Sequence, residues 1–99
     1  MGDPYKAISD ETRRNILELL GNKGRATAGE IAKNFIVSKP AISNHLRILK
    51  EANLINEQKI RQNRVYTINV EEIAKMTNFL ETLIAKGRLY QYPHRLEGG

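Results

Sequence analysis

Two capped helical segments separated by only a short junction occupy the middle of this sequence. Thr27 and Glu30 have the Thr-x-x-Glu spacing of a capping box, which predicts a helix to about Asn34. The inner face of this helix is expected to consist of Ile31, Ala32 and Phe35. Ser38 is a suitable N-cap for the next helix, so residues 36–37 alone separate the two segments. Two helices that meet across so tight a turn predict a helix-turn-helix.

The second of these segments, residues 38–50, is expected to be an amphipathic helix that runs to about Ala52, with Asn53 left-handed behind it. Pro40 fits its first turn, where a missing N–H costs little. Its apolar stripe is Ile42, Leu46 and Leu49. Its outward face is Lys39, Ala41, Ser43, Asn44, Arg47 and Lys50. These side-chain types read base edges and phosphates, although an ordinary solvated helix face has a similar composition.

Positive charge is concentrated around this helix and behind it. The chain has 16 Lys plus Arg against 11 Asp plus Glu and a net charge of +5. The local excess between residues 38 and 66 is +4, because six basic residues stand against Glu51 and Glu57. The basic residues are Lys39, Arg47, Lys50, Lys59, Arg61 and Arg64. A basic segment favours a polyanionic partner, and Arg61 and Arg64 are suited to phosphate contacts that do not depend on base sequence.

The remaining pattern predicts a hairpin and three further helices. Strands are expected at about 54–59 and 64–69, joined by the polar tip 61–63. A helical turn after Asp3-Pro4 should precede a helix that is capped by Ser9 and ends at Gly21, and a loop should follow over 22–25. The buried side of that helix is expected to be Ile16, Leu17, Leu19 and Leu20. The predicted order is α-α-α-α-β-β-α, a mainly α (α+β) winged helix-turn-helix with a basic hairpin as its wing.

The last helix is expected to span Val70 to about Lys86, after an Asn69–Glu72 cap, and to stop at Gly87. Its large apolar side chains are Ile73, Met76, Phe79, Leu80, Leu83 and Ile84. These are more than a domain of this size covers from one side, which indicates a second subunit, the alternative being that all of them pack in the monomer core. Residues 1–87 are thus predicted to form one DNA-binding and dimerisation domain, and 88–99 a loosely ordered tail.

Several classes of function are excluded or disfavoured by what the sequence lacks. It contains no cysteine, which excludes disulfides, cysteine-based zinc sites and thiol redox sensing. No nucleophile, metal-ligand set or glycine-rich phosphate loop accompanies Glu71, Glu72 and Glu81, so an enzyme is not expected. No apolar run is long enough for a membrane helix and no secretory signal is present, so we expect a cytoplasmic protein without membrane insertion.

Three motifs together carry a resemblance to a known family: residues 6–20, residues 28–32, and the run Ser-x-x-x-x-Ser-x-His-Leu-x-x-Leu from Ser38 to Leu49. Over about residues 5–86 the chain resembles the ArsR/SmtB family of repressors, and within it the metal-independent SdpR-like branch. The resemblance implies a winged-helix homodimer that is joined by its first and last helices and places the helix at 38–50 in the major groove. Neither metal site of the family's metal sensors has its ligands here, and no cofactor is expected.

Combining both lines of reasoning, we predict these DNA-binding residues: Ser38, Lys39, Ala41, Ser43, Asn44, His45, Arg47, Lys50, Arg61, Gln62, Arg64 and Tyr66. For His45, packing or a phosphate contact is preferred to a metal or pH-sensing role. Arg13 and Arg14 are either DNA contacts or a solvated face. The predicted dimer interface is Tyr5, Ile8, Ile73, Met76, Phe79, Leu80 and Leu83.

The function predicted from all of these features is a sequence-specific transcriptional regulator, a repressor that binds an inverted-repeat operator as a dimer. The alternative is a winged-helix module that binds a protein through its last helix and has lost DNA binding. Release from DNA is expected to be caused by a small molecule, a partner protein or membrane sequestration of the repressor, and the sequence does not identify which. The acid-poor face of the helix at 38–50 favours DNA.

Overall fold

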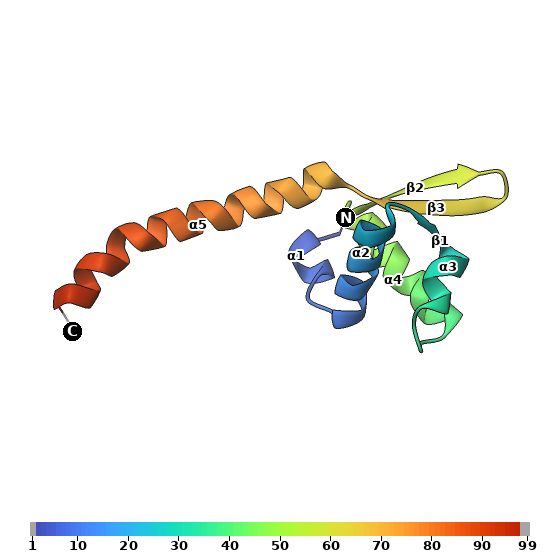
Figure 1. The fold of residues 1–99 in the computed structure, drawn as a ribbon, viewed down its shortest axis with the longest axis horizontal. Coiled ribbons are helices and arrows are strands. Elements are labelled where there is room, and N and C mark those ends of the chain that lie inside the picture. The colour runs from blue at the N-terminus through green and yellow to red at the C-terminus, as the bar shows by residue number, and fades with distance from the viewer. Residues whose placement is uncertain (1, 98–99) are drawn as a thin grey trace.

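The computed structural model describes residues 2–97, and the side chains of residues 2–90, as five helices and a small three-stranded sheet (Figure 1). The helices are α1 (Pro4–Ala7), α2 (Glu11–Lys23), α3 (Ala28–Lys33), α4 (Lys39–Glu51) and α5 (Val70–Glu97). The strands are β1 (Ala26–Thr27), β2 (Ile55–Ile60) and β3 (Asn63–Ile68). No helix in this part of the chain has the length and apolar character needed to cross a membrane.

Side-chain caps fix where the helices begin. Thr27 and Glu30 form both hydrogen bonds of the predicted capping box, and the Ser38 hydroxyl accepts from the Ala41 N–H as predicted. The prediction that Ser9 caps α2 is wrong, because the Ser9 hydroxyl donates to the Lys6 carbonyl at the end of α1. Asp10 is the N-cap instead.

The two glycines that we expected to end helices do not end them. α2 continues through Gly21 to Lys23, and Gly24 ends it with a φ of 85°, a conformation that suits glycine. α5 likewise continues through Gly87 to Glu97, so the predicted stop at Gly87 is wrong. The division into a domain over 1–87 and a tail over 88–99 stays a prediction, and residues 98–99 lie outside the described residues.

The sheet contains one strand that the sequence did not predict. β1 is only two residues long and pairs antiparallel with β3, which gives the strand order β1-β3-β2. β2 and β3 form the predicted hairpin, but Ile60 pairs with Asn63, so the turn has two residues and not three. Arg61 in this turn has a φ of 59°, and Asn53 after α4 has the predicted left-handed conformation, with a φ of 64°.

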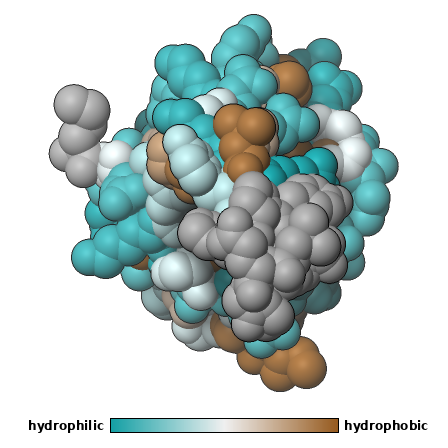
Figure 2. Space-filling model, turned by 90° about the vertical axis from the view of Figure 1, so that its left-hand side faces the viewer, coloured by the Kyte–Doolittle hydropathy of each residue, from teal (hydrophilic) through white to brown (hydrophobic). Residues whose placement is uncertain are grey.

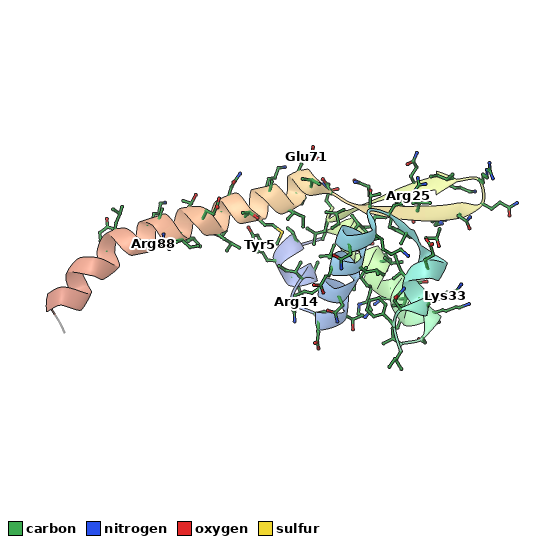
Figure 3. The ribbon with its side chains drawn as sticks, in the orientation of Figure 1. Tyr5, Arg14, Arg25, Lys33, Glu71 and Arg88 are labelled. Atoms are coloured by element: carbon green, nitrogen blue, oxygen red, sulfur yellow. The ribbon has the colours of Figure 1, made fainter. Side chains whose placement is uncertain are left out.

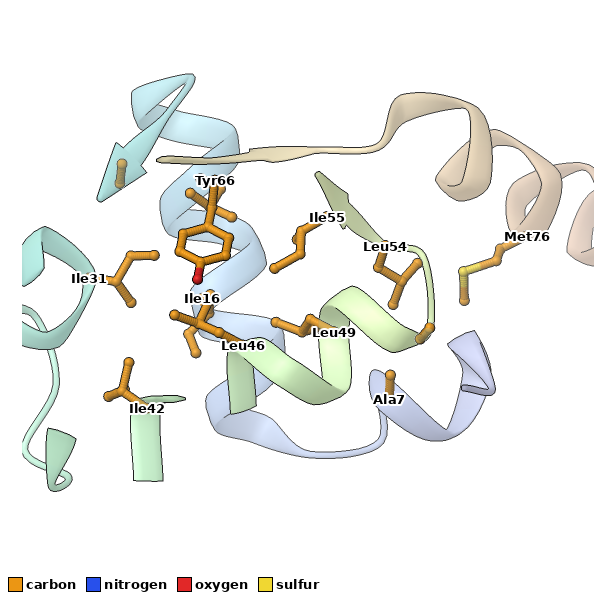
Figure 4. Close-up of a cluster of buried hydrophobic side chains, with 13 residues drawn as sticks. Ala7, Ile16, Ile31, Ile42, Leu46, Leu49, Leu54, Ile55, Tyr66 and Met76 are labelled. Carbon is orange, nitrogen blue, oxygen red and sulfur yellow. The ribbon is translucent and has the colours of Figure 1, made fainter. Parts of the chain in front are cut away.

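The core lies where α2, α3 and α4 meet the sheet (Figure 4). The whole predicted stripe of α4 is buried in it, together with Ile16 and Leu20 of α2 and Ile31 of α3. Leu54, Ile55 and Tyr66 cover it from the side of the hairpin. Burial of these side chains fixes α4 by one face only. The opposite face of α4 is therefore available to a partner.

Candidate nucleic-acid interface

The outer face of α4 is the centre of the candidate site. Ser38, Lys39, Ser43, Asn44, Arg47 and Lys50 are exposed, and Ala41 is half-buried. α3 lies against α4 and a short connection joins them, which is the predicted helix-turn-helix (Figure 1). In that connection the Ile36 side chain is fully exposed, at 105% of its reference area. The helix therefore presents polar and cationic groups from its first turn to its last.

Arg47 forms hydrogen bonds with two side chains of its own helix. Its guanidinium donates to Asn44 Oδ1 at 2.7 Å and to Glu51 Oε1 at 3.0 Å. All three residues lie on α4 and are exposed, so these bonds hold the guanidinium along the helix surface without burying it. The hydrogen bond to Asn44 therefore orients the guanidinium, which the predicted contact of Arg47 with a base requires.

The hairpin β2–β3 is the predicted wing. It projects away from the helices (Figure 1). Arg61 and Gln62 form its turn, between the paired residues Ile60 and Asn63, and both are exposed. Arg64 is exposed on β3, closer to α4. Both cations are accessible to phosphates, as the prediction requires.

Glu57 on β2 joins the wing to α4, a role that was not predicted from the sequence. Its carboxylate accepts from Lys50 Nζ of α4 at 2.5 Å, from Arg64 Nη1 at 3.2 Å and from the Tyr66 hydroxyl at 2.7 Å. These side chains line a groove of about 330 Å³ between α4 and the hairpin, together with Ser43 and Arg47. One carboxylate thus holds a cation from each of the two expected DNA-binding elements.

This arrangement shifts the protonation of both acidic groups in the groove. The hydrogen bond from Lys50, reinforced by those from Tyr66 and Arg64, lowers the pKa of Glu57 to about 2. Burial of the ring, and then the hydrogen bond to Glu57, raise the pKa of Tyr66 to about 12. At neutral pH the network therefore contains a carboxylate and a neutral phenol.

The lowered pKa of Glu57 predicts a loss of stability in acid. Since the folded-state pKa is about 2 and the ordinary value is 4.5, the stabilisation is complete above pH 4.5 and is lost as the pH falls to 2. Glu57→Gln should lower the free energy of unfolding at neutral pH by about 1–3 kcal/mol. The loss is smaller than the full pKa shift implies, because solvent screens Lys50 and Arg64, which are 52% and 65% exposed. Urea unfolding of both proteins between pH 7 and pH 2 checks this prediction. The difference in the free energy of unfolding between wild type and variant should decrease toward pH 2, and a constant difference would contradict the assignment.

Two predicted contact residues do not have the surroundings of a DNA contact. Tyr66 is buried, with 6% of its surface exposed, and its hydroxyl is used by Glu57, so the prediction of a direct contact is wrong for it. His45 is half-buried against α2, where its Nδ1 lies 3.2 Å from Arg13 Nη1 and 3.9 Å from Asp10 Oδ2. This position supports the packing interpretation of His45.

Arg14 is exposed, as a solvated face predicts, and Arg13 is half-buried, while a DNA contact by either residue stays a prediction. Arg13 Nε donates to the Ala7 carbonyl at 2.6 Å, and Arg14 Nη1 donates to the Ile8 carbonyl at 2.8 Å. The two guanidiniums therefore hold the end of α1 on α2. They are structural in the free chain.

An apolar surface on α1 and α5 is the second candidate interface. Tyr5, Phe79, Leu80 and Leu83 are exposed at 42–52%, and the rings of Tyr5 and Phe79 meet edge to face with centroids 5.9 Å apart. Figure 3 shows Tyr5 on the side of α1 that faces α5. Seen from the end of α5, separate hydrophobic patches break a largely hydrophilic surface (Figure 2). The alternative that the whole stripe of α5 packs in the monomer core is wrong.

Not every residue predicted for the dimer interface lies on this surface. Met76 is buried in the core of its own chain, with Leu54 and Ala7 nearby (Figure 4), which corrects its assignment. Ile8 and Ile73 are half-buried and pack against the same core. Ile73 and Met76 in the first turns of α5 therefore belong to the monomer core, and the exposed apolar surface that α5 shares with α1 begins at Phe79.

Comparison with known proteins gives concordant results. Residues 10–57 match the family described as "Bacterial regulatory protein, arsR family". The chain is 45% identical over 87 residues to "Transcriptional repressor SdpR" of Bacillus subtilis (strain 168), covering 88% of this chain and 96% of that one. It is 34% identical over 79 residues to "Transcriptional activator HlyU" of Vibrio cholerae, covering 79% and 71% of the two chains.

A solved structure has the same arrangement of elements. The "ArsR-like Transcriptional Regulator from Rhodococcus sp. RHA1" aligns with a TM-score of 0.79 at 30% identity, covering 93% of this chain and 87% of that one.

Proposed function

This chain belongs to the arsR family of bacterial regulatory proteins and is a DNA-binding transcriptional regulator, and we propose that it acts as a homodimeric repressor at an inverted-repeat operator. The observation that carries the proposal is the outer face of α4: it is exposed, cationic and flanked by a basic hairpin. An α-helix of this kind fits the major groove of B-DNA.

The side chains of α4 suggest specific base contacts. Arg47 and Lys39 are suited to the O6 and N7 acceptors of guanine, and Asn44 to the N6 and N7 groups of adenine. Ser43 is suited to either a base edge or a phosphate. Arg61, Gln62 and Arg64 on the wing would contact the backbone beside the reading helix, and such contacts set orientation but carry little sequence information.

The dimer is proposed from the surface of α1 and α5. Tyr5, Phe79, Leu80 and Leu83 form an apolar surface that a second copy can cover by two-fold symmetry. A two-fold dimer would place its reading helices about 34–36 Å apart, one turn of DNA, and would therefore select an inverted repeat. Binding over a promoter would block transcription, and we place this activity in the cytoplasm.

The direction of regulation is proposed from the similarity to "Transcriptional repressor SdpR", which exceeds that to "Transcriptional activator HlyU". The rival function, a winged helix that binds a protein and not DNA, has no specific observation in its favour. Its α4 would have no need of an acid-poor outer face.

Selection from a pool of random duplexes, followed by a gel shift on the selected sequence and on the chain's own upstream region, tests the proposal. We expect one inverted repeat to be enriched and bound with higher affinity than a scrambled duplex. A promoter fusion to that repeat should be repressed when the chain is expressed. Failure to enrich any sequence would contradict sequence-specific binding, and activation of the fusion would contradict repression.

The tip of the wing offers a direct test of the phosphate contacts. Arg61 forms no ion pair with the side chains that the structure describes, so its charge is available to DNA. Arg61→Gln should weaken binding to all sequences alike and reduce the slope of log affinity against log salt by about 0.9. Gel shifts on the selected and scrambled duplexes at several salt concentrations measure it. A loss confined to the selected duplex would show that Arg61 reads sequence.

A further inference from the structure

Glu57 differs from every other acidic group near the candidate interface in how it is surrounded. Its side chain is 13% exposed, whereas those of its partners Lys50 and Arg64 are 52% and 65% exposed. The carboxylate is therefore largely shielded from solvent at the base of the groove, and the two cations extend outward from it. Because it already accepts three hydrogen bonds, it has little to gain by turning toward solvent.

The basic side chains of this region differ in the acidic side chains with which they pair. Glu57 engages Lys50 and Arg64, and Glu51 engages Arg47. The pair of Glu51 and Arg47 is exposed on both sides and lies on a single helix, so DNA can displace it at little cost. Glu57 instead links α4 to β3 through a shielded carboxylate. The folded hairpin therefore keeps the Glu57 carboxylate in the groove beside Lys50 and Arg64.

We propose that Glu57 is a specificity-determining residue of the DNA interface, which positions Lys50 and Arg64 and withholds part of their charge from DNA of arbitrary sequence. The inference rests on the proposed function and deepens it. Glu57 itself touches no DNA in this proposal and acts through the two cations that it holds.

The physical basis is the different dependence of the two binding modes on charge and position. Non-specific binding is governed by the number of phosphates that cations neutralise, so a carboxylate between two cations reduces it. Specific binding also needs cations at fixed positions, and a side chain held in place before binding loses less conformational entropy on binding. Lys50 and Arg64 keep unused N–H groups, because an ammonium has three donors and a guanidinium five. Glu57 thus lowers non-specific affinity more than specific affinity.

The test compares the full-length wild type with Glu57→Gln and with Glu18→Gln, which removes the same charge from an exposed position on α2. Each protein is titrated with a scrambled duplex and with the duplex that the wild type selects, at about 50–200 mM salt. For Glu57→Gln we expect scrambled-duplex affinity to rise about threefold to tenfold above that of Glu18→Gln, with a salt slope steeper by about 0.9. The ratio of selected to scrambled affinity should fall by a similar factor.

Equal salt slopes and equal ratios of selected to scrambled affinity for the two variants would overturn the proposal. Glu57 would then only stabilise the fold. If the wild type binds duplexes but selects no sequence, the proposed operator recognition is contradicted. The salt slopes of the two variants on the scrambled duplex then still show whether Glu57 reduces the charge that Lys50 and Arg64 present to DNA. A wild type that binds no duplex overturns both proposals.

A second pair of variants provides a test if Glu57→Gln does not fold, as judged by circular dichroism. Arg61→Gln and Arg64→Gln each remove one exposed cation of the wing, but only Arg64 is paired with Glu57. We expect Arg64→Gln to reduce the salt slope on scrambled DNA by clearly less than Arg61→Gln. Equal reductions would mean that Glu57 withholds no charge from DNA, and would overturn the proposal.

Discussion

Replacing Leu80 by glutamate should dissociate the proposed dimer into monomers and abolish tight binding to the proposed operator. Leu80 is half exposed on α5, beside Phe79 and Leu83. Burying a fully exposed leucine contributes about 1.5–3 kcal/mol, so covering the exposed half of Leu80 contributes about half of that, and a two-fold interface contains it twice. A buried unpaired carboxylate reverses that gain, because the charge loses its hydration. A monomer contacts a single half-site, so loss of the dimer also lowers the affinity for the operator.

Light scattering gives the mass of the variant, and a gel shift on the selected duplex gives its affinity. Thr82→Glu is the matched control, since residue 82 lies about 200° around the helix from residue 80 and is also exposed. We expect the control to remain dimeric and to bind as the wild type does. If Leu80→Glu has the same mass as the control, the surface of α1 and α5 is not the dimer interface.

Local patterns were enough to predict the helix-turn-helix and to distinguish the buried face of α4 from its exposed face. The stripe Ile42, Leu46 and Leu49 is buried, and Ser38 caps the helix that carries it. These features depend on residues within a few positions of one another, so hydrophobic period and capping chemistry specify them. Helix ends were harder to predict, because a glycine such as Gly21 or Gly87 can continue a helix at a cost of only about 1 kcal/mol.

The Glu57 network could not be found from the predicted hairpin, because the register was wrong by one residue. A turn of three residues, 61–63, pairs residue 60 with 64 and therefore 57 with 67. The actual turn pairs Ile60 with Asn63 and Glu57 with Tyr66. Arg61 has a positive φ without being glycine, so the sequence contained no signal for a turn of two residues. The register of β2 on β3, once known, places Glu57 beside Tyr66.

The apolar stripe of α5 shows a different limit. Met76 is buried in its own chain and Phe79 is exposed, although both lie on the stripe predicted from one periodicity. Periodicity identifies the apolar face of a helix and does not distinguish a chain's own core from a partner's surface. The distinction depends on where α5 leaves the rest of the molecule, which is a property of the whole fold (Figure 1).

Arg47→Ala should reduce affinity for the selected operator by about 1–3 kcal/mol and relax the preference at one base pair of each half-site. The guanidinium is held by Asn44 at 2.7 Å and by Glu51 at 3.0 Å, and only the first of these partners is neutral. When DNA binds, a guanine can replace Glu51 as the acceptor of the Arg47 guanidinium, while the hydrogen bond to Asn44 keeps the guanidinium oriented. Alanine removes both the bidentate donor and this orientation.

Repeating the random-duplex selection with the variant identifies the position at which preference is lost, and gel shifts on matched single-base substitutions measure the size of the loss. Glu51→Ala is the control, because it leaves the guanidinium and its bond to Asn44 intact. We expect it to select the wild-type sequence. If Arg47→Ala also selects that sequence and loses affinity equally for all duplexes, Arg47 contacts phosphate, and the reading of guanine must be reassigned to Lys39.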